Sequence, residues 1–166
     1  MIKNTFKNAD EAYKYFFREI LKNGVEFDDT QALFNVGFTI ENPTDNHIVD
    51  KGCIVPRNWN QEYAEAEWQW YLTGDPKIST LGDIYGKVPE IWKRMADIRG
   101  QVNSNYGYQW ERNDQLDSII THLRVNPKSR RGAISIYDAK EMHKYSHDTP
   151  CTYAVQFTTL NNKLNM

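Results

Sequence analysis

Hydrophobic side chains recur along several parts of the chain at the spacing of an amphipathic helix. Gly24 and Gly74 each follow such a stretch, and a left-handed backbone at Gly24 would end the first helix at little cost. Asn126 and Pro127 stop another stretch, because proline disfavours helical backbone at the residue before it. Helices are therefore predicted for four ranges: 10–23, 61–73, 89–98 and 114–125.

Hydrophobic and polar residues alternate elsewhere, and this period of two is typical of strands. Asn161 and Asn162 suit a tight hairpin turn, because asparagine tolerates positive φ. Only residues 163–166 follow that turn, so the sequence is expected to stop within the hairpin. Strands are predicted for three ranges, the first with one face in the core: 32–40, 132–137 and 151–159.

Composition narrows the class of protein. The 166 residues suffice for one domain with a single core, and 40% of them are hydrophobic. A net charge of −2 gives no basic face for nucleic acid or an anionic membrane. No apolar run could span a bilayer, and the first residues lack the apolar stretch of a signal peptide, so a cytoplasmic protein is expected. Cys53 and Cys151 are far apart, which fits a reducing compartment better than a disulfide framework.

Cys151 is the first candidate for chemistry. It follows Pro150 at the start of a predicted strand, where a side chain often faces a cleft. A single cysteine is more often inert core, and reactivity requires surroundings that favour the thiolate. Arg130 and Arg131 precede another predicted strand, either as solvated charge or as a fork for a phosphate group.

A metal site is a weaker candidate. His143 and His147 are four residues apart and would share a helix face, but zinc needs further ligands. Asp138, Glu141 and Asp148 are nearby, and together they fit no familiar ligand pattern. Exposed histidines and no metal are therefore expected. A cysteine protease is set aside because no family signature surrounds the thiol.

Four segments occur in an order that resembles the successive motifs of thymidylate synthases: WQWYLTGD at 68–75, NSNYGYQW at 103–110, PKSRRG at 127–132 and TPCTYAVQF at 149–157. Three details look more like the phage deoxycytidylate hydroxymethylase branch of that family. They are the run NSNYG, Gly132 after the arginine pair, and Thr152 where a synthase usually has histidine. Both the synthase branch and the hydroxymethylase branch therefore remain candidates for this chain.

The resemblance implies an α+β fold in which helices pack on a large mixed β-sheet, whose other face forms a homodimer interface. Residues 1–166 would be a single thymidylate synthase-like domain that lacks its C-terminal third. The family's base-reading residue and its folate-binding C-terminus are expected beyond Met166. The protein would work in the cytoplasm, or in the host cytoplasm if a phage encodes it.

The resemblance also implies the reaction, which is one-carbon transfer from 5,10-methylenetetrahydrofolate to carbon 5 of a deoxypyrimidine monophosphate. Cys151 would add to carbon 6 of the pyrimidine, since a covalent adduct splits one hard step into easier ones. Glu67 would organise water and move protons at the ring, although the pattern alone is equally typical of a carboxylate on the solvated face of a helix. Tyr106 would lie beside the reacting carbon and Trp92 beside the folate, although both also fit ordinary core aromatics.

Arg130 and Arg131, with Ser129 of the same segment, match the group that in this family reaches the nucleotide phosphate across the homodimer. One departure concerns the phosphate loop after the first helix, where relatives carry a cation. This chain has Asp28 and Asp29 there, and two acids would repel a phosphate unless Lys22 or another cation substitutes. The alternative function is a noncatalytic relative that binds a nucleotide or a protein partner.

Overall fold

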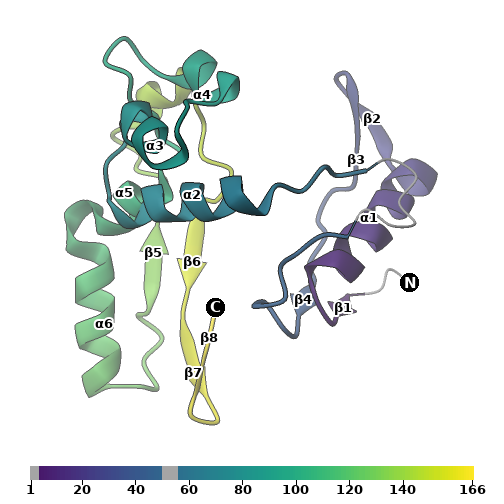
Figure 1. The fold of residues 1–166 in the computed structure, drawn as a ribbon. Coiled ribbons are helices and arrows are strands. Elements are labelled where there is room, and N and C mark those ends of the chain that lie inside the picture. Colours follow the sequence, from purple (N-terminus) through teal and green to yellow (C-terminus); the bar gives the residue numbers. More distant parts are fainter. Residues whose placement is uncertain (1–3, 50–55) are drawn as a thin grey trace. The chain divides into compact units, whose positions relative to one another are not determined.

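The structure is a computed structural model that describes residues 4–49 and 56–166 (Figure 1). Cys53 lies outside the described residues. The chain forms two compact units, Met1–Gln61 and Glu62–Met166, and each is described by itself. The expectation of one domain over 1–166 stays a prediction.

The first unit is built around helix α1, which confirms the prediction for 10–23. Its elements are β1 (Thr5–Phe6), α1 (Ala9–Asn23), β2 (Val25–Phe27), β3 (Thr30–Ala32) and β4 (Thr39–Ile40). The side chain of Asn8 caps α1 by accepting a hydrogen bond from the Glu11 backbone N–H at 3.0 Å. Phe6 is 1% exposed and packs against Tyr15 and Phe16 of the helix, with ring centroids 5.2 and 5.3 Å apart.

Gly24 does not have the predicted left-handed backbone. Its φ is −64° and its ψ is 145°, and its N–H donates to the Ile20 carbonyl at 2.8 Å. A Cβ at this position would collide with that same carbonyl oxygen. Glycine is therefore needed for a close approach to the helix end and not for a positive φ.

The single strand predicted for 32–40 is wrong. β2 and β3 form an antiparallel hairpin whose turn is Asp28 and Asp29, while β4 pairs with β1 over two residues in parallel. Phe34 packs on Phe27 at 5.3 Å, and both side chains are more than half exposed. The alternating pattern therefore marks two short pairings and an aromatic contact, not one strand with a buried face.

The second unit contains the remaining helices, and two of the predicted ones are confirmed with nearly the expected ends. α2 closes at Gly74, which has a φ of 63°. α4 is shorter than predicted because Asp97 forms a turn, its Oδ1 accepting from the backbone N–H groups of Arg99 and Gln101. The helices are α2 (Gln61–Leu72), α3 (Ile78–Tyr85), α4 (Glu90–Met95), α5 (Tyr106–Glu111), η1 (Arg112–Asp114), α6 (Gln115–Val125) and η2 (Met142–Ser146).

The strands of this unit are β5 (Ala133–Ser135), β6 (Ala154–Gln156), β7 (Thr158–Leu160) and β8 (Lys163–Asn165). β5 pairs with β6 and β7 with β8, both antiparallel. Asn161 and Asn162 have φ values of 51° and 58°, which confirms the predicted hairpin turn. The range 151–159 is divided instead into β6 and β7, and Cys151 precedes β6.

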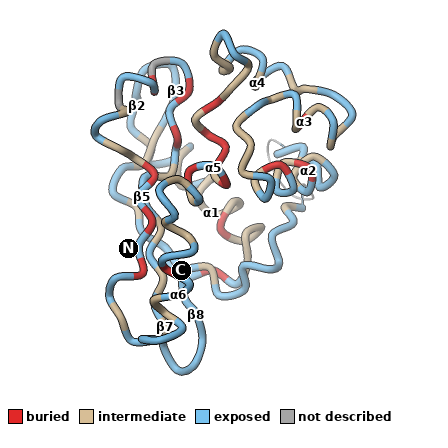
Figure 2. The backbone as a smooth tube through the Cα atoms, turned by 90° about the vertical axis from the view of Figure 1, so that its left-hand side faces the viewer, coloured by how far each residue is buried: buried red, intermediate tan, exposed pale blue. Residues whose placement is uncertain are grey.

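Helices and strands are mixed, as an α+β fold requires. Within the described residues the strands form four two-stranded sheets instead of one large mixed sheet. Figure 2 shows buried positions along α5 and β5, whereas β7 and β8 are mostly exposed. Within the second unit, two groups of buried side chains form core clusters: Ala66, Trp70, Leu81 and Val102 between α2, α3 and the loop after α4, and Ile119, Ile134 and Ile136 between α6 and β5.

Candidate active site

The Cys151 thiol is exposed and lies in the segment that leads into β6. The hydroxyl oxygen of Tyr106 accepts hydrogen bonds from the backbone N–H groups of Cys151 at 3.0 Å and Thr152 at 3.3 Å. Tyr106 is the first residue of α5, so the helix start fixes the backbone that carries the thiol. Two predicted catalytic residues, 45 positions apart in the chain, are brought into contact.

The segment NSNYG explains why α5 starts at this point. Asn105 is fully buried, and its side-chain oxygen caps α5 by accepting from the Tyr108 backbone N–H at 2.8 Å. Its amide donates to the Asp75 carbonyl at 3.0 Å. A Cβ at Gly107 would collide with the Tyr71 carbonyl, so only glycine lets α5 lie this close to α2.

A buried carboxylate holds the other end of the thiol segment. Asp148 is 6% exposed, and its two oxygens accept from the backbone N–H of Ser104 at 2.7 Å and from the Ser104 hydroxyl at 2.6 Å. Asn103 donates to the carbonyls of Lys144 and Asp148, both at 2.9 Å. From the sequence, Asp148 is a candidate only as a metal ligand. Asp148 lies three residues before Cys151 and is instead held by hydrogen bonds from Asn103 and Ser104.

Glu67 lies in a chain of hydrogen bonds and not on a simple solvated face. The hydroxyl of Tyr63 donates to the Glu67 carboxylate at 2.6 Å, and the indole N–H of Trp92 donates to the Tyr63 oxygen at 2.8 Å. Burial, together with the neighbouring carboxylate, raises the pKa of Tyr63 well above its usual value, so the phenol keeps its proton. Tyr63 thus joins two predicted site residues, Glu67 and Trp92. Tyr63 is not among the residues predicted from the sequence, although its position one helical turn before Glu67 is a usable signal.

Aromatic rings fill the space beside these two groups. Tyr71 packs edge-on against Tyr106 at 5.6 Å, and Trp110 stacks with Tyr106 at 6.5 Å. Burial raises the pKa of Tyr71, and the charges of Glu67 and Asp148 act in the same direction. Tyr71 lies one helical turn after Glu67 on α2, and its ring contacts Tyr106, whose hydroxyl binds the segment that carries the thiol.

The arginine segment lies at the other end of the β5–β6 pair. Arg130 and Arg131 are exposed, and the Ser129 hydroxyl accepts from the Arg131 backbone N–H at 3.1 Å and bonds His122 at 2.6 Å. The arginines lie directly before β5, at the end of the strand pair where the Phe157 backbone N–H donates to the Gly132 carbonyl. Cys151 lies beyond the opposite end, where Ser135 pairs with Ala154. At about 3.3 Å per residue this separation is on the order of 20 Å. Within one chain, then, the structure does not bring the guanidinium groups to the thiol.

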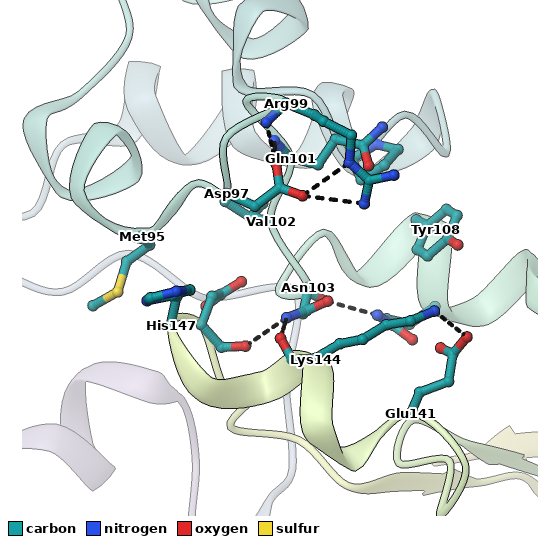
Figure 3. A pocket seen from close by; sticks show the side chains of 13 residues that line it. Met95, Asp97, Arg99, Gln101, Val102, Asn103, Tyr108, Glu141, Lys144 and His147 are labelled. Atoms are coloured by element: carbon teal, nitrogen blue, oxygen red, sulfur yellow. Dashed lines mark hydrogen bonds and ion pairs between the residues drawn. The ribbon is translucent and has the colours of Figure 1, made fainter.

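A separate pocket of about 470 Å³ opens between the loop after α4, α5 and η2 (Figure 3). Its charged groups are engaged with one another: Arg99 pairs with Asp97 at 3.1 Å, and Lys144 with Glu141 at 2.7 Å. The residues that line it do not include Glu67, Trp92, Tyr106 or Cys151. Its lining does include Asn103 and Asp148, which hold the segment before Cys151.

The described residues contain no group of three His, Cys, Asp or Glu side chains that could hold a metal ion. Glu141, two residues before His143, forms ion pairs with Arg112 at 2.9 Å and with Lys144, so its carboxylate oxygens are already engaged with cationic side chains. No described helix is long and apolar enough to cross a membrane. The expectation that no metal is used stays a prediction.

These features agree with the comparison to known families. The thymidylate synthase family model matches residues 11–166, and the chain belongs to that family. It is 37% identical over 114 residues to the deoxycytidylate 5-hydroxymethyltransferase of Enterobacteria phage T4, a match that covers 64% of this chain and 45% of that protein. It is 33% identical over 163 residues to the thymidylate synthase of Buchnera aphidicola subsp. Baizongia pistaciae, over 93% of this chain and 60% of that protein.

The fold agrees as well. The thermostable thymidylate synthase A from Bacillus subtilis superposes with a TM-score of 0.59 at 20% identity, over 93% of this chain and 61% of that one. The family resemblance and the α+β, thymidylate synthase-like fold class are thereby confirmed. The chain spans about half the length of the curated relatives it matches, between 45% and 60%.

Proposed function

We propose that this chain carries the nucleophile of an enzyme that transfers a one-carbon unit from 5,10-methylenetetrahydrofolate to carbon 5 of a deoxypyrimidine monophosphate. The observation that carries the proposal is the exposed Cys151 thiol, with its backbone fixed by Tyr106 in a chain of the thymidylate synthase family. An exposed thiol on a fixed segment can reach a flat ring, whereas a thiol walled into the core could not.

In this proposal the Cys151 thiolate forms a bond to carbon 6 of the pyrimidine, and the displaced electron pair makes carbon 5 a nucleophile. Folate, when bound, supplies the methylene group that carbon 5 attacks. A base then takes the proton on carbon 5, and the bond between the methylene and the folate nitrogen breaks, with its electron pair leaving on that nitrogen. A hydride from the tetrahydrofolate, which becomes dihydrofolate, or a water molecule that gives up a proton then adds to the methylene. The electron pair returned to the ring re-forms the bond between carbons 5 and 6 and expels sulfur from carbon 6, which restores the thiolate. Glu67 handles protons at the ring through water, and Tyr106 keeps the thiol segment in place.

Trp92 is the proposed contact for the folate. Its ring is held by an edge-on contact with the fully buried Trp70 at 5.4 Å and by the hydrogen bond to Tyr63 at 2.8 Å. A ring fixed from two sides presents a constant flat surface, which suits a heteroaromatic partner.

Arg130, Arg131 and Ser129 are proposed to hold the nucleotide phosphate of a second subunit. Two observations support this: both guanidinium groups are exposed, and they lie on the order of 20 Å along the sheet from the thiol of their own chain. A homodimer would place the arginines of one subunit at the thiol of the other. In this proposal the acidic turn at Asp28 and Asp29 has no part in phosphate binding. The reaction is proposed to take place in the cytoplasm.

Product analysis tests the proposal. The protein is incubated with dUMP or dCMP and 5,10-methylenetetrahydrofolate, and the nucleotide is examined by mass spectrometry. A methylated product assigns the synthase reaction, and a hydroxymethylated product assigns the hydroxymethylase reaction. Nucleotide binding with no product from either substrate would contradict the proposal and favour the noncatalytic alternative.

A further inference from the structure

Tyr63 occupies a position that neither the fold nor the proposed chemistry by itself explains. It lies one turn before Glu67 on α2, half-buried, with its ring edge-on to Tyr85 of α3 at 5.3 Å. Its hydroxyl bridges Glu67 on its own helix and Trp92 on α4. Contacts from the three helices α2, α3 and α4 therefore fix the position of the Tyr63 hydroxyl oxygen.

The direction of the hydrogen bonds follows from the chemistry of the groups. An indole N–H can only donate, so the Tyr63 oxygen must accept from Trp92. The phenol proton is then available to Glu67, whose oxygen lies 2.6 Å away. A hydrogen bond from a hydroxyl to a carboxylate is of the short, charge-assisted kind, and it restricts the rotation of the carboxylate.

We propose that Tyr63 is a positioning residue, whose hydroxyl orients the Glu67 carboxylate and couples it to the ring of Trp92. One carboxylate oxygen of Glu67 is held by the phenol, which leaves the other to act on water and on the nucleotide ring. Movement of Trp92 changes the place of the Tyr63 oxygen and therefore the orientation of Glu67. The role in catalysis rests on the proposed function, whereas the coupling of the three side chains does not.

The first test is a double-mutant cycle on turnover. Tyr63→Phe keeps the ring and removes the hydroxyl, and it is expected to lower kcat about tenfold while the nucleotide KM stays within about twofold. In a Glu67→Gln background the same change is expected to have no further effect, because the partner it positions is gone. Losses of kcat that simply add would overturn the proposal.

Tyr13→Phe is the matched control, because Tyr13 is also a half-buried tyrosine packed on a ring, 6.0 Å from Phe17 in the first unit. Its kcat is expected to equal that of the unmodified protein. Absence of turnover in the unmodified protein would count against the proposed function, and the coupling is then decided by the second test.

The second test needs no activity. The indole N–H signal of Trp92, assigned with Trp92→Phe among the five tryptophans, is followed in a proton–nitrogen correlation spectrum. Glu67→Gln is expected to move this signal when Tyr63 is present and to leave it in place in Tyr63→Phe. A signal that moves equally in both backgrounds would overturn the coupling.

Discussion

The segment that carries Cys151 and the segment that carries Arg130 and Arg131 both adjoin the β5–β6 pair, but they are held very differently. The thiol segment is fixed at two points, by Tyr106 and through Asp148. The arginine side chains are exposed, in a turn organised by Ser129. Bond formation at carbon 6 requires a fixed nucleophile, because small misplacements cost much of the rate. A phosphate contact tolerates long, exposed side chains, and in the proposed homodimer these come from the second subunit.

The largest effect is expected at the thiol itself. Cys151→Ala removes the proposed nucleophile and should lower turnover by about a thousandfold or more. Its thermal unfolding temperature should match that of the unmodified protein, because the side chain is exposed. Steady-state kinetics and calorimetry check both statements, and turnover within tenfold of normal would contradict them.

The arginine segment should show a smaller effect of a different kind. Arg130→Ala with Arg131→Ala is expected to lower kcat/KM for the nucleotide roughly 100-fold, because the proposed charge-assisted bonds to phosphate would be lost. Lys128→Ala, an exposed cation in the same turn, is the control and should change it less than about threefold.

Mixing these variants tests whether the arginines act across subunits. Cys151→Ala protein lacks the thiol and the arginine variant lacks the phosphate contacts. A mixture allowed to exchange subunits should therefore regain activity at one site of the mixed dimer. A mixture as inactive as its components would contradict a phosphate site shared between subunits.

The hydrogen bonds from Ser104 to Asp148 should contribute mainly to the stability of the fold. Ser104→Ala removes the hydroxyl that donates to the buried carboxylate, and the free energy of unfolding should fall by about 1.5–3 kcal/mol. Ser118→Ala, on the exposed face of α6, should cost less than about 0.5 kcal/mol. Chemical denaturation measures both, and equal losses would contradict the assigned role of Asp148.

The smallest effect concerns the ion pairs of Glu141 beside the pocket. Lys144, and after it Arg112, lowers the pKa of Glu141 below its usual 4.5, so the pairs stabilise the fold above that value. This contribution is lost as the pH falls through the lowered pKa. Glu141→Gln should cost more at pH 7 than at the acid end of the titration, where the ion pairs with Lys144 and Arg112 are already lost, and chemical denaturation at the two pH values measures the difference.

Local signals were sufficient for several elements. α1, α2 and α6 follow from helical spacing, with Gly74 and Asn126 marking the ends of α2 and α6, and the β7–β8 turn follows from its two asparagines. The motif order led to Cys151, Tyr106, Glu67 and the arginines, but their roles stay predictions. These signals are local because each depends on backbone preferences within a few residues.

Other features depend on contacts between distant segments. α5 needs the close approach of Gly107 to the Tyr71 carbonyl. In the range 151–159, pairing begins only at Ala154, after the two backbone N–H groups that donate to Tyr106. The Tyr63–Trp92 bond spans 29 residues, and the Ser104–Asp148 bonds span 44. No periodicity in a single sequence records such pairs.

The most direct test of the central claim is the mass of the protein after incubation with 5,10-methylenetetrahydrofolate and 5-fluoro-dUMP or 5-fluoro-dCMP. Fluorine at carbon 5 cannot leave as the proton does, so the covalent complex should persist. A mass increase that matches nucleotide plus folate, mapped to the peptide with Cys151, is predicted for at least one analogue. Cys53→Ala protein should also form it and Cys151→Ala protein should not. No adduct with either analogue, or one that survives Cys151→Ala, would contradict the account.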